Sequence, residues 1–183
     1  AVLTMQSQGS SYLYFGHVGQ LLLGEELARQ GVTPSLDYVL RDVEMRLEIA
    51  LYLVRDGTAG QAMKAAAQDG SATDRLEALA EDVGLTADTM TRSVKEVLSD
   101  LEDRGASFAP ALAADGSLTA AGYGILKDGS LAAWADREAA LGINLILSRV
   151  DADVVELTPE GESPAALRVV GARSVVRPLF TGD

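Results

Sequence analysis

Histidine, cysteine and clustered carboxylates carry most metal and nucleophilic chemistry, and this chain has few of them. His17 is its only histidine, and it has no cysteine. A hydrolytic triad would have to be built on His17, for which a structural role at a helix start is the preferred interpretation. Cys-ligated metal sites and thiol nucleophiles are excluded. Three acidic residues in residues 151–156 could bind a cation or form a solvated turn.

No cofactor is expected. The chain has no Walker A motif, and the glycines of residues 16–24 do not follow a convincing strand, so they do not make a dinucleotide-binding fingerprint. With neither a cofactor motif nor a set of catalytic side chains, the sequence does not predict an enzyme.

A more specific pattern lies in residues 76–98. A bihelical DNA reader needs a small residue in its first helix, a glycine at the turn, apolar residues that lock the crossing angle, and a polar outer face on the second helix. These places are occupied by Leu79, Ala80, Val83, Gly84, Leu85 and Met90.

Residues 45–105 resemble winged helix-turn-helix transcription regulators of the catabolite-activator and multiple-antibiotic-resistance kinds, with residues 45–55 as the leading helix. The resemblance implies DNA binding and transcription regulation. It also implies that polar residues of the second helix face phosphates and bases. These residues are Thr86, Thr89, Thr91, Arg92 and Lys95.

The charge of the chain favours a different interpretation of the same helix pair. Fifteen basic residues stand against 27 acidic residues, a formal net charge of −12, and a molecule of this charge repels polyanions. Within the predicted second helix, residues 86–104, three basic side chains stand against five acidic ones. Because neutralisation of phosphates supplies much of DNA affinity, the pair is also interpreted as two packed helices in a core.

Helices must position these residues. A helix over residues 34–55, with Thr33 as its cap and Gly57 at its end, is expected at the centre of the fold, because its apolar residues form two surfaces. Further helices are predicted over residues 17–30, 59–68, 72–83, 87–104 and 130–141.

The β-rich parts of the sequence are short. Residues 106–129 are broken by glycines and Asp-Gly pairs and indicate a loop with short strands at most. Two short strands are possible at residues 2–5 and 12–15. Beyond the last helix, β-rich runs separated by turn residues predict a small antiparallel sheet; they are residues 143–150, 154–158, 166–170 and 174–180.

The sequence therefore predicts an α+β fold with a helical N-terminal two-thirds around the helix 34–55 and a small antiparallel sheet at the C-terminus. Residues 1–105 form the helical region, and residues 106–183 pack on it. No apolar run reaches the roughly 20 residues of a membrane helix, and no signal-peptide pattern is present, so a soluble, cytoplasmic protein is expected.

Two hypotheses of function follow. One is a DNA-binding regulator with a winged-helix-like module, whose partner is duplex DNA. The other is a non-catalytic structural subunit that assembles into a larger homo- or hetero-oligomeric complex, through self-association or through other protein subunits. Neither hypothesis requires a metal, a cofactor or a membrane.

Overall fold

A computed structural model describes residues 18–69, 71–82, 90–150, 153–157, 165–175 and 177. It does not describe the side chains of residues 69, 80–82, 153–157 and 165. The possible strands at residues 2–5 and 12–15 lie outside the described residues. Within them, no helix has the length and apolar character needed to cross a membrane.

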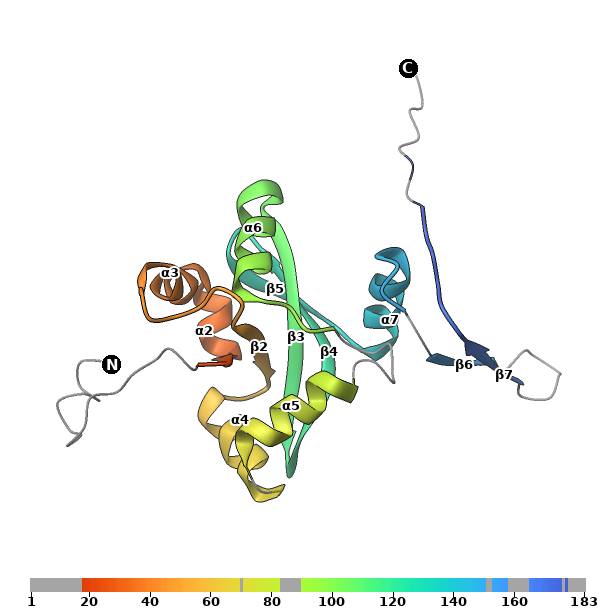
Figure 1. Ribbon diagram of the computed structural model, residues 1–183, viewed down its shortest axis with the longest axis horizontal. Coiled ribbons are helices and arrows are strands. Elements are labelled where there is room, and N and C mark those ends of the chain that lie inside the picture. Colours follow the sequence, from red (N-terminus) through yellow and green to blue (C-terminus); the bar gives the residue numbers. More distant parts are fainter. Residues whose placement is uncertain are drawn as a thin grey trace, which may run out of the picture.

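A five-stranded mixed sheet forms the middle of the molecule (Figure 1). Its strands lie side by side in chain order. The first three strands are mutually parallel, and the last two are added as antiparallel hairpins. The strands are β1 (Gln20–Gly24), β2 (Ala50–Arg55), β3 (Ala106–Asp115), β4 (Ser117–Lys127) and β5 (Ser130–Ala135).

Helices make the two crossover connections between the parallel strands. The β1–β2 crossover contains α2 (Glu25–Gln30) and α3 (Thr33–Arg41). The β2–β3 crossover is longer and contains α4 (Ala59–Ala66), the 3₁₀ turn η1 (Ala67–Asp69), α5 (Ala72–Asp82) and α6 (Val94–Arg104). After β5 come α7 (Arg137–Ile146) and a separate two-stranded hairpin of β6 (Asp153–Leu157) and β7 (Ala165–Val169).

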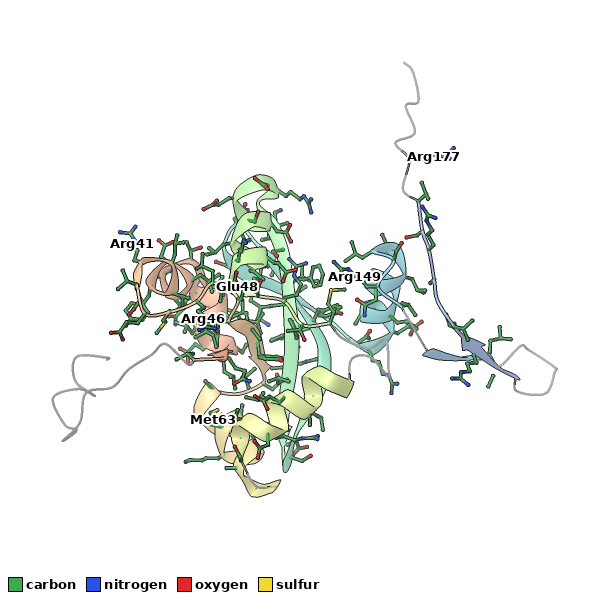
Figure 2. The ribbon with its side chains drawn as sticks, viewed as in Figure 1. Arg41, Arg46, Glu48, Met63, Arg149 and Arg177 are labelled. Atoms are coloured by element: carbon green, nitrogen blue, oxygen red, sulfur yellow. The ribbon has the colours of Figure 1, made fainter. Side chains whose placement is uncertain are left out.

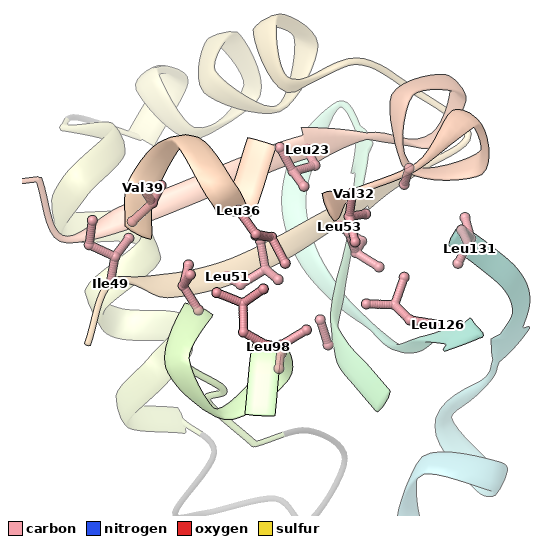
Figure 3. Close-up of a cluster of buried hydrophobic side chains, with 14 residues drawn as sticks. Leu23, Val32, Leu36, Val39, Ile49, Leu51, Leu53, Leu98, Leu126 and Leu131 are labelled. Atoms are coloured by element: carbon pink, nitrogen blue, oxygen red, sulfur yellow. The ribbon is translucent and has the colours of Figure 1, made fainter. Parts of the chain in front are cut away.

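Both faces of the sheet are covered, and β2 contributes to the core on each side. Leu51 and Leu53 pack into the cluster under α2, α3 and α6, which Figure 3 shows in close-up. Tyr52 and Val54 pack into a second cluster, under α4 and α5. All four side chains are buried, as expected for a central strand of a parallel sheet covered by helices on both faces.

The predicted helix over residues 34–55 is therefore wrong, because this segment is a helix followed by a strand. The helix α3 ends at Arg41, where the Asp42 side chain accepts a hydrogen bond from the backbone N–H of Glu44 at 3.0 Å. This local bond offers the backbone an alternative to helix and supports a turn. The apolar residues 51–54, which the prediction divides between two surfaces of a helix, alternate between the two faces of β2.

The predicted loop over residues 106–129 is also wrong, since these residues form β3 and β4, the longest strands of the sheet. Both hairpins turn at Asp-Gly pairs. Gly116 joins β3 to β4, and Asp128 and Gly129, both with positive φ, join β4 to β5. Asp-Gly is a strong hairpin signal, but the alanine-rich flanks on either side of it have low β-propensity.

Other predicted elements differ in type or length. Residues 17–30 contain β1 before α2, residues 130–141 contain β5 before α7, and most of residues 143–150 belong to α7 or the turn after it. Residues 174, 175 and 177 are not in a strand. The positions of α4, α5, β6 and β7 lie close to the prediction, but the predicted arrangement, a helical N-terminal two-thirds with a C-terminal sheet, is wrong.

Two glycines with positive φ provide a test of the β3–β4 hairpin. A Cβ at Gly122 (φ 80°) would lie 2.2 Å from the carbonyl oxygen of Ala135, whereas a Cβ at Gly116 (φ 72°) would meet nothing within 4 Å. We predict that Gly116→Ala costs about 1–2 kcal/mol from backbone strain alone. Gly122→Ala should cost about 1–3 kcal/mol more, because backbone atoms must move to relieve the overlap.

Denaturant unfolding of the two variants measures this difference in the free energy of unfolding. Equal losses in both variants would show that the hairpin does not pack against Ala135 as described.

Candidate functional site

The carboxyl ends of β1 and β2 lie side by side, at the edge where proteins with parallel sheets commonly hold ligands. Gly24 ends β1 and Arg55 ends β2, so α2 begins at Glu25 beside the turn that leads from β2 into α4. This edge of the sheet is therefore the candidate site. The Glu25 carboxylate connects the elements that meet there.

The Glu25 carboxylate accepts hydrogen bonds from three elements. Its Oε2 accepts from the backbone N–H of Asp56 at 2.7 Å, and its Oε1 accepts from Arg29 Nε at 2.8 Å and from Trp134 Nε1 at 3.3 Å. The Arg55 guanidinium lies over the Trp134 ring, 5.9 Å from its centroid. The group therefore joins α2, the end of β2 and β5.

Its surroundings hold Glu25 in the charged form. Partial burial raises the pKa of Glu25, but the hydrogen bonds from Asp56, Arg29 and Trp134 and the charge of Arg29 outweigh that effect, so the pKa lies below its usual value of 4.5. A general acid or base needs a pKa nearer neutrality and a free lone pair. The pKa of Glu25 lies further from neutrality than that of a free glutamate, and its hydrogen bonds to three elements give it a structural role.

Beside Glu25 lies an open hollow of about 340 Å³. The start of α4 borders it, but the capping box of α4 already pairs Thr58 with Gln61: the Gln61 N–H donates to Thr58 Oγ1 at 3.2 Å, and the Thr58 N–H donates to Gln61 Oε1 at 2.8 Å. The hollow is lined by Gly24, Glu26, Leu27, Gln30, Gly57, Thr58 and Ala59. The helix start therefore does not present these donors to a ligand.

In the part of the chain that the structure describes, no three His, Cys, Asp or Glu side chains lie together in a way that would hold a metal ion. His17 and Asp151 are outside this part, as are the side chains of Asp153 and Glu156. The suggestions of a catalytic histidine and of a cation at residues 151–156 therefore remain untested.

The predicted DNA-contacting residues lie in different settings. Thr86 and Thr89 fall outside the described residues. Thr91 is exposed ahead of α6, Lys95 is exposed on α6, and Arg92 is buried. The observed helix α6 begins at Val94, so it is shorter than the helix predicted over residues 87–104.

Arg92 points into the protein. Its guanidinium bonds to Asp100 Oδ2 at 2.5 Å and stacks over the Phe108 ring, 4.5 Å from the centroid. Asp100 also bonds to Arg104 at 3.3 Å and to the Ser107 hydroxyl at 3.3 Å. The backbone carbonyl of Arg92 accepts the N–H of Leu51 at 2.8 Å, which fixes this segment against β2. Arg92 therefore holds α6 against the sheet through its contacts with Asp100 of α6 and Phe108 of β3.

One local sequence signal marks the true start of α6. Ser93 and Glu96 form a capping box: the Ser93 hydroxyl accepts the Glu96 N–H at 3.2 Å, and the Glu96 carboxylate accepts the Ser93 N–H at 2.8 Å. Burial raises the pKa of Glu96, but the Ser93 bonds and the charges of Arg92 and Arg149 bring it below 4.5. A Ser-x-x-Glu pattern indicates a helix start, whereas the predicted helix over residues 87–104 places it in a helix interior.

Comparison with known proteins identifies the family. The model of the spore germination protein N-terminal domain matches residues 1–114, more than half of the chain. The chain belongs to this family. A solved structure described as the GerBC protein has a similar fold, with a TM-score of 0.71 and 15% sequence identity. The likeness covers all of this chain but only 52% of that chain, and no curated protein matches.

Family membership overturns the resemblance to winged helix-turn-helix regulators and, with it, the expectation of transcription regulation. The physical reason is that the predicted DNA-recognition helix, residues 86–104, is not one exposed helix. Its N-terminal part pairs with β2, as the bridge between Ala50 and Ser93 shows, and Arg92 is turned inward. The assignment of Thr86, Thr89, Thr91, Arg92 and Lys95 to DNA contacts depended on the resemblance and loses its basis.

The two basic residues near the start of α6 should differ in their effect on stability. We predict that Arg92→Ala costs about 3 kcal/mol, the low end for breaking a buried ion pair, because Asp100 keeps Arg104 and Ser107 as partners. The exposed Lys95→Ala is the matched control and should change stability by less than about 0.5 kcal/mol. Urea unfolding compares them, and similar small losses would place Arg92 on the surface.

The hydrogen bonds of Glu25 predict a pH dependence. Because the folded pKa lies below the unfolded value, Glu25 stabilises the fold above about pH 4.5, and this contribution is lost as the pH falls through the folded pKa. Glu25→Gln should therefore flatten the fall in denaturant midpoint between about pH 5 and pH 3. Glu102→Gln, on the exposed side of α6, controls for the loss of one charge. A wild-type slope in Glu25→Gln would contradict the assignment.

Proposed function

We propose that this chain is a non-catalytic subunit of a protein complex that acts in spore germination. The observation that carries the proposal is the family match, which spans β1, β2, the helices between β2 and β3 and most of β3. The fold likeness to GerBC is in keeping with it, because the described strands and helices share the fold of that protein and not that of a winged-helix regulator.

The state of the charged groups supports a non-catalytic role. The Glu25 and Asp100 carboxylates each accept hydrogen bonds from three residues, and both connect elements of the fold. Contacts with other proteins, not chemistry on a small molecule, are therefore the proposed activity. The cytoplasmic location expected from the sequence stays a prediction.

Deletion of the gene in the source organism tests the proposal. Spores without the protein should germinate more slowly than wild-type spores, measured as the fall in optical density after a germination stimulus, and a copy of the gene should restore the rate. A core-disrupting variant, Leu53→Asp, should behave like the deletion, because Leu53 is fully buried in β2.

Glu25→Gln separates a structural subunit from an enzyme. If the role is non-catalytic, the germination rate of this strain should be proportional to the amount of the protein detected on an immunoblot. Loss of germination at a normal protein level would point to chemistry at Glu25. Unchanged germination in the deletion strain would refute the role in germination itself.

A further inference from the structure

The Asp-Gly pairs of this chain form turns, and they also hold two groups that can react with each other. The chain has four such pairs, at residues 56–57, 69–70, 115–116 and 128–129. The backbone nitrogen of the glycine can attack the Cγ atom of the aspartic acid side chain, because no side chain on the glycine hinders its approach. The N–H proton and the carboxyl hydroxyl leave as water, and a succinimide ring closes between the two residues.

The succinimide ring then takes up water. Opening at the side-chain carbonyl restores aspartate, whereas opening at the main-chain carbonyl gives isoaspartate, in which the backbone runs through Cβ and Cγ. A water molecule is lost and another is gained, so the mass is unchanged and no oxidant or reductant is needed. Ring closure requires the peptide plane of the pair to rotate, so its rate depends on what holds the turn.

The turn at residues 56–57 is held at both of its residues. The Asp56 N–H donates to Glu25 Oε2 at 2.7 Å, and the Gly57 carbonyl accepts the Glu25 N–H at 3.1 Å. The Asp56 carboxylate also lies 3.7 Å from Arg55 Nε. This peptide plane can rotate only when the contacts with α2 open.

The turn at residues 128–129 is held in the same way. The Asp128 N–H donates to the Gly105 carbonyl at 2.7 Å, and the Gly129 carbonyl accepts the Val32 N–H at 2.7 Å. Rotation of this peptide plane therefore requires the turn to separate from the end of α6 and from the start of α3.

The turn between β3 and β4, at the lower end of the sheet in Figure 1, has no such anchors. Asp115 and Gly116 are both exposed, and no backbone hydrogen bond joins Gly116 to another residue in the part of the chain that the structure describes. The pairing of Asp115 with Ser117 closes the turn. Its peptide plane can rotate once this last pair of the ladder opens. Gly70 lies outside the described residues, so the argument concerns the other three pairs.

We propose that Asp115–Gly116 is a site of spontaneous isoaspartate formation, and that it reacts before the two anchored pairs. Local opening costs least where the fewest bonds must break. In the folded protein, isoaspartate should therefore form about tenfold faster at residue 115 than at residue 56 or 128, which each have two further hydrogen bonds to lose. This inference goes beyond the proposed function and does not depend on it.

The modification would also affect α5. Isoaspartate lengthens the backbone by one atom next to the pair of Ala114 and Leu118. The Leu118 carbonyl accepts hydrogen bonds from Arg75 of α5, at 2.9 Å from Nη2 and 3.2 Å from Nε, and the Leu118 side chain is fully buried. A displaced ladder moves this carbonyl, so isomerisation at Asp115 should loosen α5.

Peptide mapping of the aged protein tests the proposal. The purified chain is incubated below its unfolding temperature and digested with trypsin, and chromatography separates isoaspartate from aspartate peptides of equal mass. The three pairs fall in different tryptic peptides, residues 56–64, 105–127 and 128–137. Peptides left uncut before residue 56 or residue 128 are included, and electron-transfer fragmentation locates the isoaspartate. Met63 is exposed on α4 (Figure 2), so the oxidised form of its peptide is also counted.

Two controls separate the effect of structure from that of local sequence. In urea, where no turn is held, the three pairs should react at similar rates. Asparagine closes the same ring with loss of ammonia, which is seen as a change in mass. Asp115→Asn should therefore deamidate about tenfold faster than the matched variant Asp128→Asn in the folded protein.

Isoaspartate that forms at residue 56 or 128 as fast as at residue 115 in the folded protein would overturn the proposal. So would the same order of rates in urea, or equal deamidation of the two asparagine variants. Amide hydrogen exchange in α5 should be faster in the isoaspartate fraction, and unchanged exchange would refute the effect on α5. None of these measurements uses germination, so failure of the proposed function would leave this inference standing.

Discussion

Burial of β2 on both faces is the constraint on which the rest of the fold depends. Leu51 and Leu53 require a cover on one side, Tyr52 and Val54 require one on the other, and parallel neighbours must satisfy both edges of the strand. Each crossover therefore returns across a face of the sheet, with α2 and α3 on one face and α4 and α5 on the other. The position of α6, on the same face as α3, closes the larger cluster.

The same constraint explains why the sequence predicts the wrong architecture. A strand buried on both faces has a continuous apolar run, which has no period of two and is easily joined to a preceding amphipathic helix. Residues 50–54 resemble the end of a helix for this reason. The helix at residues 59–66 carries its own capping signal, and its prediction is close to the observed bounds. The β3–β4 hairpin escapes prediction because alanine has a low β-propensity, and the pairing of β3 with β2 and β4 that holds these residues in strands is a tertiary effect.

At the candidate site, too, features set by local sequence can be predicted, whereas features set by long-range contacts cannot. The inward position of Arg92 depends on Asp100, Ser107 and Phe108, which come together only when α6 packs on β3. Glu25 likewise meets Trp134 only because α2 packs against β5. Neither partnership has a sequence pattern. The Ser93 capping box, by contrast, is local, and its Ser-x-x-Glu spacing alone argues against a single reader helix through residues 87–104.

The turn between β4 and β5 reaches back to the first crossover. The Gly129 carbonyl accepts the N–H of Val32 at 2.7 Å, and a side chain at Gly129 would collide with the Thr33 hydroxyl. On the ribosome, α3 and β2 emerge well before this turn and before β3, the neighbour of β2. The nascent chain must therefore carry β2 with one edge unpaired until β3 has been synthesised, at residue 115, and α3 without its contact to Gly129 until later still. Folding of high contact order makes this interval long, and it is when the protein is most exposed to aggregation and most dependent on chaperones.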